Sequence, residues 1–398
     1  MTAPADLTLP LVQSTTLHGL YTRYLRRQSK LMQKLPWSKL MTNQPEASKT
    51  VLGLIQKAQA EEPGLYFSIL RQPSVGGALR SIENALRDGD LEHASDWTAG
   101  LFSQLAVELW QAGKIRESME VLVGRPVLLC ESADWSTAVP AGFDCIEVTP
   151  QNLYFSKAGD DAREPVDINQ PCGIEIRDGI SLCLVDVNPL ALNEAHPDKE
   201  GNRLNLGNAS AEQWVHSVSE ALELIEMVLP ELYAEMKMAL RWLVPVGVDQ
   251  REHVSASYQE VIGTIYLSLH PNVITMAEAL IHEFSHTKLN ILGTFDPMFS
   301  NAFSPHFPSP YRPDARPLHG ILLGVHAFLP IERFLERLAA KGHPQSLDPG
   351  FQRRRRELRG KNRVACETLV LHGETSEVGQ GLMDEIVRLN GEFGELLR

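Results

Sequence analysis

Residues 261–292 read VIGTIYLSLHPNVITMAEALIHEFSHTKLNIL, and the fold around the candidate site follows from this stretch. Over residues 261–269 apolar side chains alternate with polar ones, which predicts a half-buried strand. Thr275 and Glu278 have the spacing of a capping box, in which a hydroxyl and a carboxylate bond to the first turn of a helix. We therefore expect a helix over residues 276–292, directly after the strand.

This expected helix contains the sequence His-Glu-Phe-Ser-His at residues 282–286. His282 and His286 are four residues apart, so they project from one helix face and their ring nitrogens can converge on one ion. Glu283 stands beside the first histidine, within reach of a metal-bound water. Zinc hydrolases use this spacing, because the ion acidifies the water and the glutamate takes its proton. The extended histidine pattern of the metzincins does not follow.

A second expected helix starts near Asp314 and carries His319 and His326 on one face. Pro330 has no N–H for the carbonyl of His326, so we expect the helix to kink or open there and to aim His326 at a ligand. We favour His326 over His319 as the third metal ligand. Glu332 and Glu336 stay open as carboxylate ligands, although a regular helix places them away from His326.

The two helices are joined by a loop over residues 296–311 that contains several prolines and shows no periodicity. A loop of this length beside a candidate site is usually functional. It continues into Arg312 and Arg316, whose planar guanidinium groups suit the binding of a carboxylate near the metal. An ion pair with Asp314 that fixes the loop is an equally good interpretation of these arginines.

Further out, the first third of the chain shows amphipathic helical patterns, and short apolar runs between residues 126 and 187 indicate strands. A long helical pattern covers residues 211–243. We therefore predict an α+β protein, mainly helical, with a small mixed β-sheet in the middle and a metal site between two C-terminal helices. We divide it into a helical N-terminal region (1–118), a small mixed-sheet region (119–208) and a helical metal-site region (209–398).

The chain of 398 residues is 43% hydrophobic and carries a net charge of -13. General nucleic-acid binding is excluded by this charge, because it requires a basic surface. The five cysteines are an odd number without any Cys-x-x-Cys pair, which indicates reduced structural thiols. Neither a signal-peptide core nor an apolar run of membrane-spanning length is evident. We expect a cytoplasmic protein that does not bind membranes; its oligomeric state is open.

Three runs together resemble one family: SASYQEVIGTIYLSL (255–269), AEALIHEFSHTKLN (277–290) and YRPDARPLHGILLGVHAF (311–328). They closely resemble the HExxH-motif peptide-modification proteins encoded beside ribosomally made peptide precursors in bacterial gene clusters. The strong match spans about residues 251–334. Some members of the family are understood to hydroxylate side-chain β-carbons of a precursor peptide, using Fe(II) and 2-oxoglutarate.

The resemblance implies a ligand set and a partner for this chain. His282 and His286 become metal ligands, with His326 as the third. Arg312 or Arg316 becomes the holder of the 2-oxoglutarate carboxylate, and a ribosomally synthesised precursor peptide becomes the substrate. The iron assignment rests on this resemblance, since imidazole ligands suit both iron and zinc.

Three functions are therefore open. In an iron oxygenase, Glu283 orients a ligand or a water and takes no chemical step. In a zinc hydrolase that trims a peptide, Glu283 is the general base. In a non-catalytic peptide-binding protein, the metal site is vestigial. A basic tract (Arg353, Arg354, Arg355 and Arg356) is either a solvated helix surface, the simpler interpretation, or a dock for an acidic peptide.

Overall fold

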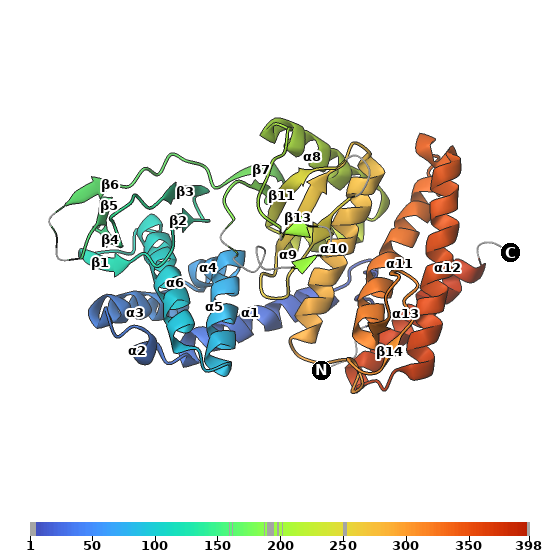
Figure 1. Ribbon diagram of the computed structural model, residues 1–398, viewed down its shortest axis with the longest axis horizontal. Coiled ribbons are helices and arrows are strands. Elements are labelled where there is room, and N and C mark those ends of the chain that lie inside the picture. The colour runs from blue at the N-terminus through green and yellow to red at the C-terminus, as the bar shows by residue number, and fades with distance from the viewer. Residues whose placement is uncertain are drawn as a thin grey trace.

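The computed structural model describes residues 5–395 except positions 159, 161, 187, 189–194, 197–198, 201 and 250–252. It is 54% helical with small mixed sheets, which confirms the α+β prediction. In Figure 1 most of the N-terminal helices lie at one end, the largest sheet lies in the centre, and the last helices lie at the other end.

Six helices form the N-terminal part of the chain. Prolines occupy the first turn of three of them, where the absent N–H is not needed. Asp90 caps the last of the six by accepting a hydrogen bond from the backbone N–H of His93. The six are α1 (Thr16–Lys34), α2 (Trp37–Leu40), α3 (Pro45–Glu61), α4 (Pro63–Leu70), α5 (Pro73–Arg87) and α6 (Leu91–Gln111).

An antiparallel sheet and a hairpin follow α6. The sheet has the order β1-β4-β5-β6, with β1 (Met119–Leu122), β4 (Cys145–Val148), β5 (Leu153–Ser156) and β6 (Arg163–Pro165). The hairpin pairs β2 (Val127–Cys130) with β3 (Trp135–Ala138). Two further two-stranded pairs are β9 (Ala195–His196) with β10 (Lys199–Glu200), and β14 (His306–Phe307) with β15 (Arg316–Pro317).

The central sheet is mixed and has the order β12-β13-β11-β8-β7. Its strands are β7 (Gly173–Arg177), β8 (Ile180–Cys183), β11 (Trp242–Val248), β12 (Ser255–Ala256) and β13 (Thr264–Leu269). Strand β11 runs parallel to both neighbours, whereas β12 is an antiparallel edge strand on β13. The sheet therefore takes strands from both sides of the predicted boundary at residue 208.

The remaining helices pack on this sheet and on one another. They are α8 (Ala211–Val228), α9 (Pro230–Ala239), α10 (Val273–Gly293), α11 (Leu318–Ala340), α12 (Pro349–His372) and α13 (Glu377–Glu395), with a short 3-10 helix η1 (Pro344–Leu347). Ser210 and Gln213 form a capping box at the start of α8. One continuous apolar core runs from the N-terminal helices through the sheets to α13.

The structure corrects three details of the sequence analysis. The pattern over residues 211–243 is two helices that break at Pro230, and it ends in strand β11 instead of continuing as helix. Helix α10 is capped by Asn272 and not by Thr275. Helix α11 begins after Pro317 without a side-chain cap, so Asp314 is not its cap, and it continues unbroken through Pro330.

Candidate metal centre

Helix α10 carries the two histidines and is buried over most of its surface. It packs against α11 on one side and against α8 and the β12–β13 end of the central sheet on others. The side chain of Asn272 starts it by accepting hydrogen bonds from the N–H groups of Ile274 and Thr275. Because α10 is packed on several sides, the backbone that carries its two histidines is held in place.

The Nε2 atoms of His282 and His286 lie 3.0 Å apart, and their ring centroids lie 4.4 Å apart. Two imidazole nitrogens that bind one ion at about 2.1 Å each are separated by at most about 4.2 Å. The pair therefore meets the distance requirement for a shared ion. Both side chains are only partly buried, so a ligand can reach them.

The environment keeps both imidazoles neutral. Burial lowers the pKa of His282 well below its ordinary value, and the charges of His286 and Arg354 act in the same direction. Burial also lowers the pKa of His286, against the opposing effect of Glu283. A neutral imidazole offers the lone pair that a metal needs. Nδ1 of His286 is buried without a hydrogen-bond partner in the part of the chain that the structure describes.

Glu283 completes the group, because one of its carboxylate oxygens lies within 4.8 Å of both histidine nitrogens. The side chain is only 3% exposed. Ser255 Oγ donates a hydrogen bond of 2.7 Å to Oε1, and Ser257 Oγ donates one of 2.7 Å to Oε2. The edge of the central sheet thus fixes the orientation of this carboxylate.

The two serines were not identified as site residues from the sequence. They are two residues apart, Ser255 in the edge strand β12 and Ser257 directly after it, and side chains at that spacing share one face of an extended chain. This two-residue spacing could have indicated that the two serines share a face, but it does not indicate which helix that face contacts. The sequence analysis also missed Phe328, whose ring centroid lies 4.7 Å from that of His282 and 4.8 Å from that of Tyr311.

His326 lies next to this group and not within it. No group of histidine and carboxylate atoms within 4.8 Å of one another includes it among the described residues. It is 0% exposed, and neither ring nitrogen meets the geometry of a hydrogen bond among the described residues, although the Ser285 backbone is near enough to raise its pKa. Burial lowers its pKa well below the ordinary value, and the charges of Lys288 and His286 contribute. A buried imidazole without a well-aligned hydrogen bond at either nitrogen is unusual, because buried polar atoms are normally hydrogen-bonded.

His319 lies in the first turn of α11 and is also close to the pair. Burial lowers its pKa, and the charge of His286 acts in the same direction. Its ring packs 5.2 Å from that of Phe303. The two carboxylates of α11 are engaged elsewhere, since Glu332 accepts a hydrogen bond from Asn362 and Glu336 pairs with Arg333.

The two loop arginines differ in their surroundings. Arg316 forms an ion pair of 2.8 Å with Asp314, and its side chain packs on Gly320. Arg312 is exposed and forms no ion pair with any residue that the structure describes, although its charge lowers the pKa of His282. Arg316 therefore matches the loop-fixing interpretation, whereas Arg312 is free to bind a ligand beside the histidines.

One residue of the basic tract faces the site. Arg354 forms an ion pair of 2.9 Å with Glu278 on α10, and its guanidinium lies 5.8 Å from the ring centroid of Phe328. Arg353 pairs with Glu357 along the exposed side of α12. The tract is thus divided between a contact that joins α12 to α10 and an ordinary solvated helix surface.

No protein-family model and no curated protein matches this chain. The resemblance to the HExxH-motif peptide-modification proteins therefore stays a prediction from the residues. An 18-residue window of α11 is apolar enough to cross a membrane, but 67% of it is buried inside the protein, as in a core helix of a soluble protein. All five cysteines are unpaired and buried, in agreement with reduced structural thiols.

Proposed function

We propose that this protein is a metal-dependent enzyme that modifies a ribosomally synthesised precursor peptide, by hydroxylating a side-chain β-carbon with Fe(II) and 2-oxoglutarate. The observation that carries the metal site is the 3.0 Å approach of the Nε2 atoms of His282 and His286, beside the anchored carboxylate of Glu283. The peptide substrate and the oxygenase chemistry come from the family resemblance.

In this proposal His282 and His286 hold the ion. His326 is the third ligand, because it is a buried histidine next to the pair and neither of its ring nitrogens makes a well-aligned hydrogen bond among the described residues. Iron held by three protein ligands would have room for a chelating 2-oxo acid and for dioxygen, and dioxygen would supply the oxidising power. The chain itself contributes orientation, through the two serines that fix Glu283, and an aromatic wall at Phe328.

Two features of the site favour an oxygenase over a hydrolase, namely the hydrogen bonds to Glu283 and the guanidinium of Arg312. Both oxygens of Glu283 already accept hydroxyl hydrogen bonds, which suits a carboxylate that orients other groups. The exposed guanidinium of Arg312, close to His282 and without an ion-pair partner among the described residues, suits the distal carboxylate of 2-oxoglutarate. A hydrolase needs no such cation.

A zinc hydrolase is the second candidate, favoured by the position of Glu283 within 4.8 Å of both histidine nitrogens. In it Glu283 would take the proton of a metal-bound water. Glu283→Gln separates the two, because it keeps the size of the side chain and one acceptor oxygen while it removes the basicity. A hydrolase would lose nearly all turnover, whereas an oxygenase would keep a measurable part.

The test is an anaerobic visible spectrum of Fe(II)-loaded protein titrated with 2-oxoglutarate, which requires no peptide. We expect a charge-transfer band that saturates in the wild type and is absent in His286→Ala. His216→Ala is the matched control, because His216 is an exposed histidine on α8. If no band appears and the protein holds zinc tightly, the assignment moves to a hydrolase. If the protein binds no metal, a non-catalytic protein is favoured.

The arginines provide a second comparison in the same titration. Arg312→Ala should raise the 2-oxoglutarate concentration at half-saturation by about tenfold or more, the usual effect of losing a charge-assisted hydrogen bond. Arg316→Ala should change it little, because Arg316 is paired with Asp314. Equal effects of both variants would show that neither guanidinium is the specific holder.

A further inference from the structure

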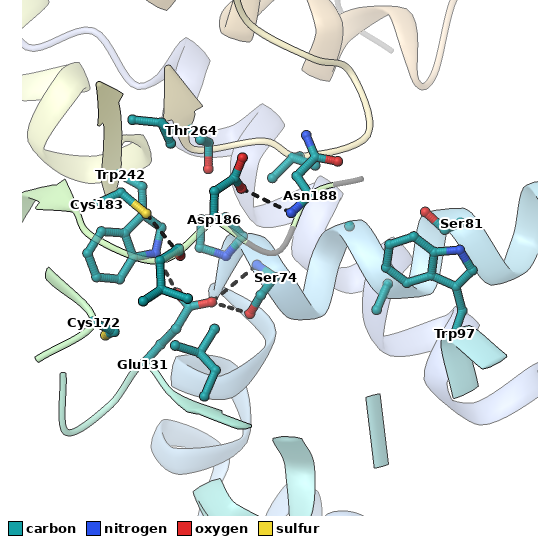
Figure 2. Close-up of a pocket in the computed structure, with 17 residues that line it drawn as sticks. Ser74, Ser81, Trp97, Glu131, Cys172, Cys183, Asp186, Asn188, Trp242 and Thr264 are labelled. Carbon is teal, nitrogen blue, oxygen red and sulfur yellow. Dashed lines mark hydrogen bonds between the residues drawn. The ribbon is translucent and has the colours of Figure 1, made fainter. Parts of the chain in front are cut away.

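A groove of about 460 Å³ lies between α6, the loop that leads into β2, and the side chains of Asp186, Asn188, Arg203 and Leu204, and none of the proposed metal ligands is among its described lining residues. It joins a smaller cavity, because the two share Trp97, Asp186 and Asn188. Figure 2 shows this smaller cavity, with Trp97 at one end, Glu131 and Trp242 at the other, and Asp186 between them. Nothing in the proposed reaction uses either space.

Arg125 lines the groove and packs closely against α6. Its guanidinium lies 4.8 Å from the ring centroid of Trp97, and its side chain crosses α6 at Gly100, where a Cβ would collide with it. Gly124, with φ +62°, presses against Ala99 and Gly100 in a conformation that L side chains rarely adopt. The two glycines allow this close approach of the arginine and its loop to α6.

This guanidinium has no counter-ion among the described residues. Its Nη2 atom is fully buried and has no hydrogen-bond partner there. Burial lowers its pKa to about 10, so it still carries its charge at neutral pH. The charge of Glu131 opposes this lowering of the Arg125 pKa. The Glu131 carboxylate accepts hydrogen bonds from Ser74 and Trp242, however, and forms no ion pair with Arg125.

A buried cationic nitrogen without a partner is destabilising unless a ligand supplies the missing acceptor. The other lining charges are a second cation, Arg203, and two acids, Asp96 and Asp186. Neither acid forms an ion pair with Arg125 among the described contacts, and Asp186 already accepts hydrogen bonds from the Tyr266 hydroxyl. The two acids would repel a doubly charged phosphate more strongly than a singly charged carboxylate.

We propose that this groove binds a carboxylate, which pairs with Arg125, while the attached carbon chain packs on the apolar wall of Trp97, Val127 and Leu204. Arginine suits this role because its planar fork matches a carboxylate. The carboxylate belongs either to a free organic acid or to an acidic side chain of a bound peptide. The site is independent of the metal centre, so it stands or fails separately from the proposed reaction.

The test uses metal-free full-length protein and follows tryptophan fluorescence at constant ionic strength. The probes are sodium butyrate, a singly charged carboxylate, the blocked pentapeptide acetyl-GGEGG-amide, its glutamine counterpart acetyl-GGQGG-amide, and inorganic phosphate. We expect saturable binding of butyrate, which identifies a free-acid site, or of the glutamate peptide but not the glutamine peptide, which identifies a peptide site. No saturable carboxylate binding, or tighter binding of phosphate than of both carboxylates, would overturn the proposal.

Variants assign the signal to the groove. Arg125→Gln should weaken carboxylate binding by about tenfold or more. Arg116→Gln, a change of an exposed arginine, should leave it unchanged. If Arg312→Ala, at the metal centre, loses carboxylate binding and Arg125→Gln retains it, the assignment of the carboxylate to the groove is refuted. If Arg125→Gln does not fold, Leu204→Trp decides, because it fills the groove and keeps the guanidinium: retained binding would contradict the proposal.

Discussion

Ser255, on the edge strand β12, donates a hydrogen bond of 2.7 Å to Oε1 of Glu283 on α10. The contact joins the central sheet to the helix that carries both histidines. Ser257 donates to the other oxygen at the same distance, so the carboxylate cannot rotate without losing one of two hydroxyl donors. The orientation of Glu283 is therefore set by the sheet edge as well as by its own helix.

Removing both hydroxyls should weaken metal binding. We expect Ser255→Ala/Ser257→Ala to lower the affinity for the bound divalent metal by about 10- to 100-fold, the usual effect of losing groups that orient a metal site. A competition titration against a coloured chelator measures it. Ser181→Ala, in a buried serine of β8 in the same sheet, is the control and should leave the affinity unchanged. Equal affinities of the double variant and wild type would contradict this role.

Metal binding should also stabilise the folded protein. Metal at about 100 times its dissociation constant contributes about 2.7 kcal/mol, which corresponds to a rise in melting temperature of several degrees. His282→Ala and His286→Ala should each abolish the rise, whereas His216→Ala should keep it. Differential scanning fluorimetry with and without Fe(II) or zinc provides the measurement. A rise that persists in both site variants would place the ion elsewhere.

Much of this fold could be predicted from local patterns. The alternation over residues 261–269 predicted strand β13, although the strand is buried on both faces instead of half-buried. A capping-box pattern predicted most of α10, although the cap is Asn272 and not Thr275. Strand β11 was missed because it is apolar along its length and lies between two parallel neighbours. A short apolar strand whose first four residues are all buried shows no alternation there, so it cannot be distinguished from the end of a preceding helix.

The candidate site, like the fold, was predictable from the sequence only where its contacts are local. His282 and His286 lie on adjacent turns of one helix, so their convergence follows from spacing alone. The contacts of Glu283 with Ser255 and Ser257 join residues 26 to 28 positions apart on different elements. The pairing of Arg354 with Glu278 joins residues 76 positions apart. Such contacts depend on how the layers pack, and no local pattern encodes them.

Asp186 should make stability depend on pH in the acidic range. Burial raises the pKa of its carboxyl to about 6, whereas an aspartate in the unfolded chain titrates near 3.9. The folded state binds this proton more tightly, so the stability it contributes is complete below pH of about 4 and is lost as pH rises through about 6. Asp186→Asn should remove this dependence.

Urea unfolding of wild type and Asp186→Asn at several pH values tests the expectation. The variant should gain about 1–2 kcal/mol relative to wild type between pH of about 4 and 7, allowing for solvent screening of this partly buried group. A difference between the two proteins that stays constant over this range would show that the carboxyl of Asp186 titrates alike in the folded and unfolded states.

Lys288 and Glu235 form a buried ion pair of 2.6 Å between α10 and α9, with the lysine side chain 0% exposed and the glutamate side chain 10% exposed. Glu235→Gln would leave the ammonium buried without its counter-charge. We expect this change to lower the free energy of unfolding by about 3–5 kcal/mol in urea titrations. Glu46→Gln, in the exposed pair with Lys49, should change it by less than about 1 kcal/mol.

The double variant Lys288→Met/Glu235→Leu tests the cause of this loss. If the loss comes from the unpaired charge, removing both charges with side chains of similar size should restore stability close to the wild-type value. If the double variant is as unstable as Glu235→Gln, the pair contributes through a specific attraction that apolar packing cannot replace. Because Lys288 lies two residues from His286 on the same helix, a metal titration of the double variant shows whether this pair also positions the histidines.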